Sequence, residues 1–138
     1  MSRKLKIDTG GTKFGPYSPG ICVKDHIWLS GQVDVDAGDD IESQTTGTLS
    51  KIDDLLAAAN SSKSDLVKVT ILMTDIEDYG TINQIYGEWL GDTIPPARAA
   101  YCVSKLPLGA LVEIVCEGFR SSGDFRTDLP PELEEALV

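Results

Sequence analysis

The sequence predicts an α+β domain with the element order βββαβαββ, a six-stranded mixed sheet and two helices packed on one face. Two observations lead to this fold class. Two separate segments carry apolar residues at the helical period, and six short segments read as strands, either as apolar runs or by alternation of polar and apolar side chains. The chain has 138 residues, 41% hydrophobic and 25% charged, which is enough for one core. We expect a single domain over residues 1–120 and an acidic C-terminal extension over 121–138.

Three strands are expected before the first helix. Residues 4–7 alternate polar and apolar side chains and predict a short strand. Residues 10–20, GGTKFGPYSPG, contain six glycines and prolines, so we expect a loop there. Apolar runs at 21–23 and 27–30 flank the polar residues 24–26, a pattern that predicts a hairpin.

The first helix is predicted over 41–59, because apolar residues recur there at three- and four-residue steps. Gly38-Asp39-Asp40 precedes it and offers an N-cap, and Asn60 follows it as a residue that tolerates a left-handed end. A second helix is predicted over 79–90, with its aromatic residues interpreted as core: Tyr79, Tyr86 and Trp89. Between the helices, residues 66–73 predict a central strand covered on both sides, with one face formed by Val67, Val69, Ile71 and Met73.

The last two strands are expected over 97–103 and 111–118. Alternation in the first places Arg98, Ala100 and Cys102 on one face. In the second, Val112, Ile114 and Cys116 share a face, and Glu113 and Glu117 share the opposite one.

Charge and residue content exclude several function classes. Lys and Arg number 12 against 22 Asp and Glu, and the net charge of −10 disfavours a nucleic-acid or anionic-membrane partner. No apolar run is long enough to span a membrane, and the basic N-terminus lacks the apolar stretch of a secretory signal. Cys22, Cys102 and Cys116 have no paired spacing and predict buried, reduced thiols and a cytoplasmic protein. The single histidine, His26, is expected in a turn or on the surface, and no metal site is predicted.

Arg98 and Glu113 are the leading candidates for chemistry. Arg98 is the only basic residue between Lys68 and Lys105, and its guanidinium can bind a carboxylate through two parallel hydrogen bonds. The alternative is an ordinary surface salt bridge. Glu113 interrupts an apolar run, so burial could raise its pKa and make it an acid or base. The alternative is a solvated strand face shared with Glu117.

Three further segments are weaker candidates. Tyr17, in the loop GPYSPG, could donate from its hydroxyl or wall off a pocket, or it could simply cover the core. Ser30 and Gly31 end a strand and could offer backbone N–H groups to an anion, or form only a bulge. Asn83 follows Ile82 and could sit only at the edge of the helix's apolar face.

Together these motifs, in this order, resemble the RidA (YjgF) family of reactive intermediate deaminases over roughly residues 4–119. The matching stretches are GPYSPG (15–20), WLSGQV (28–33), Gln44 with its helix, residues 65–86, PPAR (95–98) and KLPLGALVEI (105–114). The resemblance implies a chorismate-mutase-like fold and a homotrimer with a pocket at each subunit interface. It further implies cofactor-free hydrolysis of 2-aminoacrylate and related 2-imino acids to 2-oxo acids and ammonia. Ribonuclease activity associated with relatives is disfavoured by the charge.

Carried over by position, the resemblance assigns Arg98 to the substrate carboxylate, Glu113 to the attacking water and Tyr17 to the pocket loop. It assigns Ser30, Gly31, Asn83 and Ala100 to the pocket lining. Many relatives have a cysteine where this chain has Ala100, so a thiol nucleophile is not expected. The alternatives are a pathway-specific deaminase of aminomuconate-like or pyrimidine-derived acrylates, and a non-catalytic carboxylate-binding trimer. Pro130-Pro131 and the following ELEEAL predict a short helix outside the family's usual length.

Overall fold

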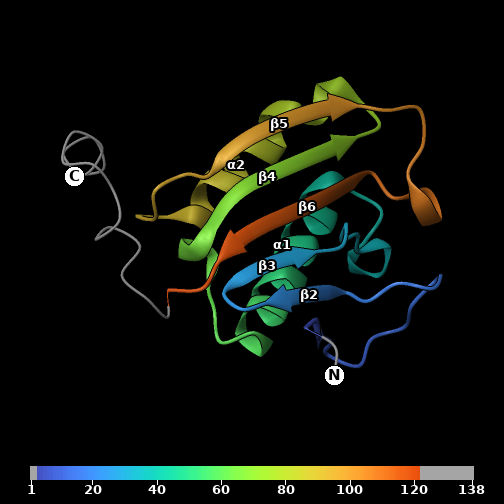
Figure 1. Ribbon diagram of the computed structural model, residues 1–138. Helices are drawn as coiled ribbons and strands as arrows, with labels where there is room; N and C mark the ends of the chain where they lie inside the picture. Colours follow the sequence, from blue (N-terminus) through green and yellow to red (C-terminus); the bar gives the residue numbers. More distant parts are fainter. Residues whose placement is uncertain (1–2, 122–138) are drawn as a thin grey trace.

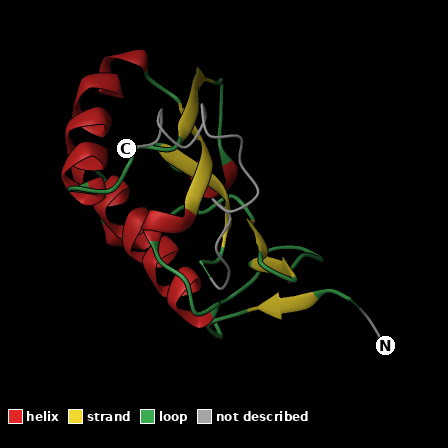
Figure 2. Cartoon of the chain, turned by 60° about the vertical axis from the view of Figure 1, so that its left-hand side comes forward, coloured by secondary structure: helices red, strands yellow, loops and turns green. Residues whose placement is uncertain are grey.

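One twisted sheet with both long helices on the same side makes up the part of the chain that the computed structural model describes, residues 3–121 (Figure 1). Figure 2, turned to another side, shows the helices on one side of the strands. The order βββαβαββ is confirmed, and the predicted extension beyond residue 121 lies outside the described residues. The elements are β1 (Leu5–Ile7), β2 (Gly20–Val23), β3 (His26–Leu29), α1 (Ile41–Ala58), β4 (Leu66–Met73), α2 (Tyr79–Leu90), β5 (Ala97–Cys102) and β6 (Val112–Phe119).

The sheet is mixed, as expected, with the strand order β1-β2-β3-β6-β4-β5. Only β4 and β5 run parallel, and α2 is the crossover that connects them. The remaining neighbours pair antiparallel, and β6 lies between β3 and β4. This order places β5 at one edge of the sheet and β6 near its middle, which decides where the two leading candidate residues lie.

The two helices begin and end where their sequences allow. The Asp40 carboxylate caps α1 by accepting a hydrogen bond from the Ser43 backbone N–H at 2.8 Å, and Asn60 adopts a left-handed φ of 56° after its end. Gly91, with a φ of 57°, ends α2. The buried stripes of both helices pack on the sheet: Leu49, Ile52, Leu55 and Leu56 from α1, and Ile82, Tyr86 and Leu90 from α2.

The helices cover only one face of the sheet. On β4, Val69, Ile71 and Met73 are fully buried beneath them, whereas Thr70 and Leu72 on the other face are half-buried. The expectation that this strand is covered on both sides is therefore wrong for the single chain. Val67 does not share the buried face either, because a bulge between Leu66 and Lys68 shifts the alternation.

Cys22 and Cys116 are buried as predicted, and burial raises the pKa of the Cys116 thiol to about 12. Three other side chains are more exposed than predicted. Cys102 is exposed, because it ends β5 at the edge of the sheet. Tyr79 is also exposed rather than core, since it stands at the first turn of α2. Trp89 is only partly buried, and its indole N–H donates to Asp53 of α1 at 2.9 Å.

A long polar side chain, Gln44, ties α1 to the segment before β6. Its amide nitrogen donates to the Gly38 carbonyl at 2.9 Å, and its amide oxygen accepts from the Leu111 backbone N–H at 2.9 Å. Gln44 is buried, so these two hydrogen bonds replace those that its amide group would make to water.

Among the described residues, no helix is long and apolar enough to cross a membrane.

Candidate functional site

Arg98 is the second residue of β5 and points to the side of the sheet that carries the helices. It pairs in register with Val69, whose side chain is fully buried on that face. The Arg98 Nη1 donates to Oδ1 of Asn83 at 2.7 Å, and Nη2 donates to the Tyr79 hydroxyl at 3.0 Å. No salt bridge to Arg98 is found among the described residues, so a carboxylate of this part of the chain does not neutralise it.

The surroundings of Arg98 come from one stripe of α2. Tyr79, Asn83 and Tyr86 are spaced four and three residues apart, so the helix presents all three to the guanidinium. The Arg98 Cζ lies 5.5 Å from the centre of the Tyr86 ring and 5.7 Å from that of Tyr79, within cation–π range. Burial raises the pKa of Tyr86 to about 12, so this phenol stays neutral beside the cation.

Ala100 lies two residues further along β5 and on the same face. It pairs with the buried Ile71 and packs against the core. Its methyl group brings no reactive atom to Arg98. We call the group formed by Arg98, Asn83, Tyr79 and Ala100 the Arg98 half-site.

Glu113 lies on β6 and points to the opposite, open face of the sheet. It pairs with the half-buried Leu72 and is itself half-buried. Burial raises the pKa of this carboxyl group above its ordinary value. Gly31 leaves it room, because a Cβ added there would lie only 2.8 Å from the Glu113 Oε2 atom.

Ser30 and Tyr17 come from the segments next to Gly31. The Ser30 hydroxyl donates to the Ser18 carbonyl at 2.6 Å, and the Ser30 backbone N–H donates to Pro19 at 2.8 Å. These bonds fasten the 10–20 loop to the end of β3, and Tyr17 is 46% exposed on that loop. We call Glu113 and Gly31, with the neighbouring Ser30, the Glu113 half-site.

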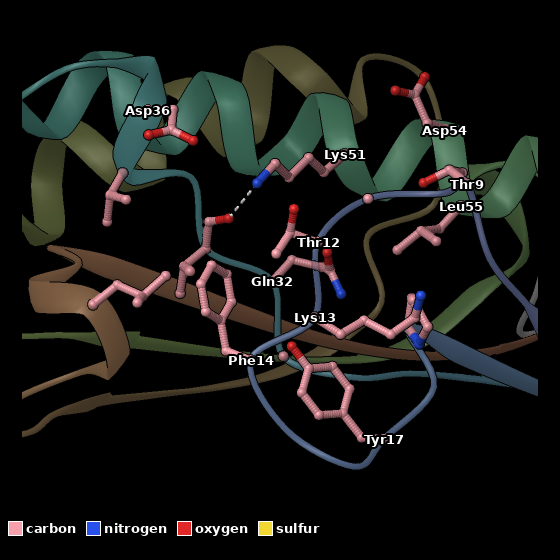
Figure 3. A pocket seen from close by; sticks show the side chains of 16 residues that line it. Thr9, Thr12, Lys13, Phe14, Tyr17, Gln32, Asp36, Lys51, Asp54 and Leu55 are labelled. Carbon is pink, nitrogen blue, oxygen red and sulfur yellow. Dashed lines mark hydrogen bonds between the residues drawn. The ribbon is translucent and has the colours of Figure 1, made fainter.

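Figure 3 shows the cavity that Tyr17 and Gly31 line, which has a volume of about 400 Å³. Phe14 and Tyr17 of the loop stand on one side, and Lys51 and Asp54 of α1 on the other. Lys13 is paired with Asp8 at 2.8 Å, and Lys51 donates to the Val33 carbonyl at 2.9 Å and lies 3.6 Å from Asp34. With Asp36 and Asp54 also in the lining, this cavity offers an anion no surplus positive charge.

The structure thus brings the candidate residues together in two groups rather than one. Arg98, Asn83 and Ala100 lie on the helix side of the sheet, and Glu113 lies on the other side beside Gly31. Tyr17 lines the cavity that α1 also lines. No cluster of three or more metal-ligating side chains occurs within residues 3–121. A single chain therefore does not place Arg98 and Glu113 around one ligand.

The open face of the sheet carries exposed aromatic side chains. Trp28 is 40% exposed and stacks on His26 with ring centres 3.5 Å apart, while the His26 Nε2 lies 2.6 Å from a Glu117 oxygen. His26 is the first residue of β3 and half-buried, so its expected turn or surface position is only partly right. Tyr101 is 58% exposed on the same face.

Tyr79 is the residue of this region that the sequence interpretation misplaced. The signal was available, since Tyr79, Asn83 and Tyr86 fall on one helical stripe. The aromatic content of the helix favoured a core assignment instead.

Comparisons with known proteins agree with this architecture. A RutC family protein of Pyrococcus horikoshii is 38% identical over 120 residues, which cover 83% of this chain and 94% of the relative. A 2-iminobutanoate/2-iminopropanoate deaminase of Mus musculus is 37% identical over 106 residues, covering 72% and 78%. The solved structure of a Rid family protein of unknown function from Yersinia pestis is 40% identical, with a TM-score of 0.79, and covers 84% of this chain and 98% of that one.

A six-stranded mixed sheet with two helices on one face defines this chain as a Rid-type α+β protein. The Endoribonuclease L-PSP family model matches residues 11–117. The chain belongs to this family, which includes the RutC and RidA proteins.

Proposed function

We propose that this protein hydrolyses small 2-imino acids, with their enamine tautomers such as 2-aminoacrylate, to 2-oxo acids and ammonia. The observation that carries the proposal is Arg98, a half-buried guanidinium whose neighbours within the described residues are neutral. Asn83 and Tyr79 each take one N–H, and a carboxylate can accept two of the others. The mouse relative, whose name states imine deaminase activity, supports the same class of substrate.

Glu113 supplies the proton transfers that imine hydrolysis needs. The carboxylate takes a proton from water as the water oxygen bonds to the C=N carbon, and it delivers that proton to the nitrogen, which gives the neutral aminol and restores the carboxylate. The tetrahedral aminol then passes its hydroxyl proton through the same carboxylate to the nitrogen. The C–N bond breaks, ammonia leaves, and the C=O bond of the 2-oxo acid forms. Water is the only co-reactant in this sequence.

The proposal requires more than one copy of the chain, because Arg98 and Glu113 of one chain lie on opposite faces of its sheet. We propose a homotrimer, as the family resemblance implies. A pocket that holds both must take one half-site from each of two neighbouring protomers. The open sheet face, with the exposed rings of Trp28 and Tyr101, supports a contact between copies there. Such a contact would bury Glu113 further.

The proposed activity is tested by generating 2-imino acids in situ with an amino acid oxidase and trapping them as semicarbazones. We expect the protein to lower semicarbazone formation and speed release of the 2-oxo acid. Arg98→Ala should abolish this effect and retain the fold, because the carboxylate loses its partner. Lys105→Ala, which removes an exposed cation after β5, is the matched control and should keep full activity.

Several outcomes would contradict the proposal. A folded protein that leaves semicarbazone formation unchanged across several amino acids is not an imine deaminase. If it still binds 2-oxo acids, as read from ligand-dependent melting, the non-catalytic carboxylate-binding trimer is correct instead. Turnover confined to acrylates derived from aminomuconate or pyrimidines would support the pathway-specific alternative.

A further inference from the structure

Tyr79 begins α2 and brings a hydroxyl group to Arg98. Its hydroxyl accepts a hydrogen bond from the Arg98 Nη2 at 3.0 Å, while Asn83 accepts from Nη1 at 2.7 Å. The two acceptors lie one helical turn apart and bind different nitrogens of the same planar group. Asn83 is half-buried and Tyr79 is exposed.

A guanidinium binds a carboxylate well only when its plane is aligned with the two carboxylate oxygens. Arg98 stands on the edge strand β5, and its long side chain has several rotamers of similar energy. One hydrogen bond to Asn83 would leave the plane free to turn about the Nη1 contact. The second bond, to Tyr79, removes that freedom, and the Tyr86 ring 5.5 Å from Cζ limits motion toward the core.

We propose that Tyr79 is a positioning residue for carboxylate recognition, which acts by fixing the plane of the Arg98 guanidinium together with Asn83. The inference rests on the proposed function, because it adds a residue to the same carboxylate site. Tyr79 itself takes no part in the proton transfers assigned to Glu113.

The variant Tyr79→Phe isolates the hydroxyl, because it keeps the ring that lies 5.7 Å from Cζ. The carboxylate is held equally in the ground state and in the transition state. The lost orientation should therefore raise KM roughly three- to tenfold with kcat nearly unchanged. The Kd for 2-oxobutanoate, a product of the proposed class, should rise by the same factor.

The experiment is a double-mutant cycle on the full-length protein, with titration calorimetry of 2-oxobutanoate as the readout. The wild type, Tyr79→Phe, Arg98→Lys and the double variant are compared. Lys has no planar group to orient, so Tyr79→Phe should change Kd in the wild type and hardly at all beside Arg98→Lys. Thr81→Val removes a hydroxyl group from the same helix, at a position that is not one of the two Arg98 acceptors, and is the control.

Each result separates this inference from the proposed function. An unchanged Kd in Tyr79→Phe would overturn the positioning role, and so would an equal rise of Kd in the wild-type and Arg98→Lys backgrounds. A rise of Kd in Thr81→Val as large as in Tyr79→Phe would overturn it too. A fall in kcat with KM unchanged would overturn it as well. A wild type that binds 2-oxobutanoate through Tyr79 but turns over no imine would refute the proposed reaction and leave the positioning role in place.

Discussion

Glu113 is a carboxyl group that the fold stabilises in its neutral form. Burial raises its pKa, so the ionised form is disfavoured in the folded chain. The stability that this group contributes is full below the ordinary carboxyl pKa and is lost as pH rises through the raised value. The residue proposed to carry the proton transfers therefore lowers stability at neutral pH.

The variant Glu113→Gln tests this cost. We expect its Tm to equal that of the wild type at about pH 4, where both side chains are neutral. The Tm of the variant should exceed that of the wild type increasingly toward about pH 7, where Glu113 is charged and the Gln is not. Thermal melts across this range are the measurement, and imine hydrolysis should be lost at every pH. A variant that is less stable than the wild type near neutral pH would show that the charged carboxylate stabilises the fold.

Residue 31 has to be a glycine because the Glu113 carboxylate fills the space that a side chain at position 31 would take. In Gly31→Ala the new Cβ would meet the carboxylate at 2.8 Å and must displace it. We expect loss of most of the activity with a native circular dichroism spectrum, because the neighbour that moves is a side chain. Gly80→Ala, where a Cβ meets no atom within 4 Å, is the control and should retain activity. Full activity in Gly31→Ala would contradict the assigned position of Glu113.

At the scale of elements, Gln44 is the link that holds α1 against the strand layer. Gln44→Ala would leave the Leu111 N–H and the Gly38 carbonyl without their partner. We expect a loss of about 1–3 kcal/mol in the free energy of unfolding, measured with urea. The exposed Thr46→Ala on the same helix should change it by less than about 0.5 kcal/mol. Equal effects in the two variants would show that the Gln44 bonds contribute nothing.

The elements themselves could be predicted because each has a local signal. The helix expected over 41–59 is observed at Ile41–Ala58, since its apolar period and its cap lie within the segment. Alternation also placed Arg98 and Ala100 correctly on one face of β5. Val67 could not be placed, because a bulge depends on how two strands pair and leaves no trace in the alternation of one of them.

The site is predictable only in part, for a reason that belongs to the whole molecule. Residue chemistry and motif resemblance both point to Arg98 and Glu113 as candidates. These two residues lie on opposite faces of the sheet because β4 pairs with β5 on one side and with β6 on the other. This pairing joins strands that are distant in sequence. Residue spacing along one chain carries no such information. The trimer itself stays a prediction.

The open sheet face offers a direct test of assembly. Trp28→Glu would add a second carboxylate opposite Glu117, its register partner on β6. We expect sedimentation to show monomers in place of trimers, with the fold retained because the helix-side core is untouched. Ile76→Glu, a matched change at an exposed position beside α2, should leave the assembly unaltered. Unchanged sedimentation of Trp28→Glu would exclude this face as the subunit contact.

The central claim is that one active site joins Arg98 of one protomer to Glu113 of its neighbour. Arg98→Ala and Glu113→Gln, each inactive alone, are mixed in equal amounts, dissociated and reassembled. Every mixed trimer then contains one site with both native residues, so imine hydrolysis should return to about one quarter of the wild-type rate. If the mixture stays as inactive as its two components while mixed trimers form, both residues act within a single protomer and the account is wrong.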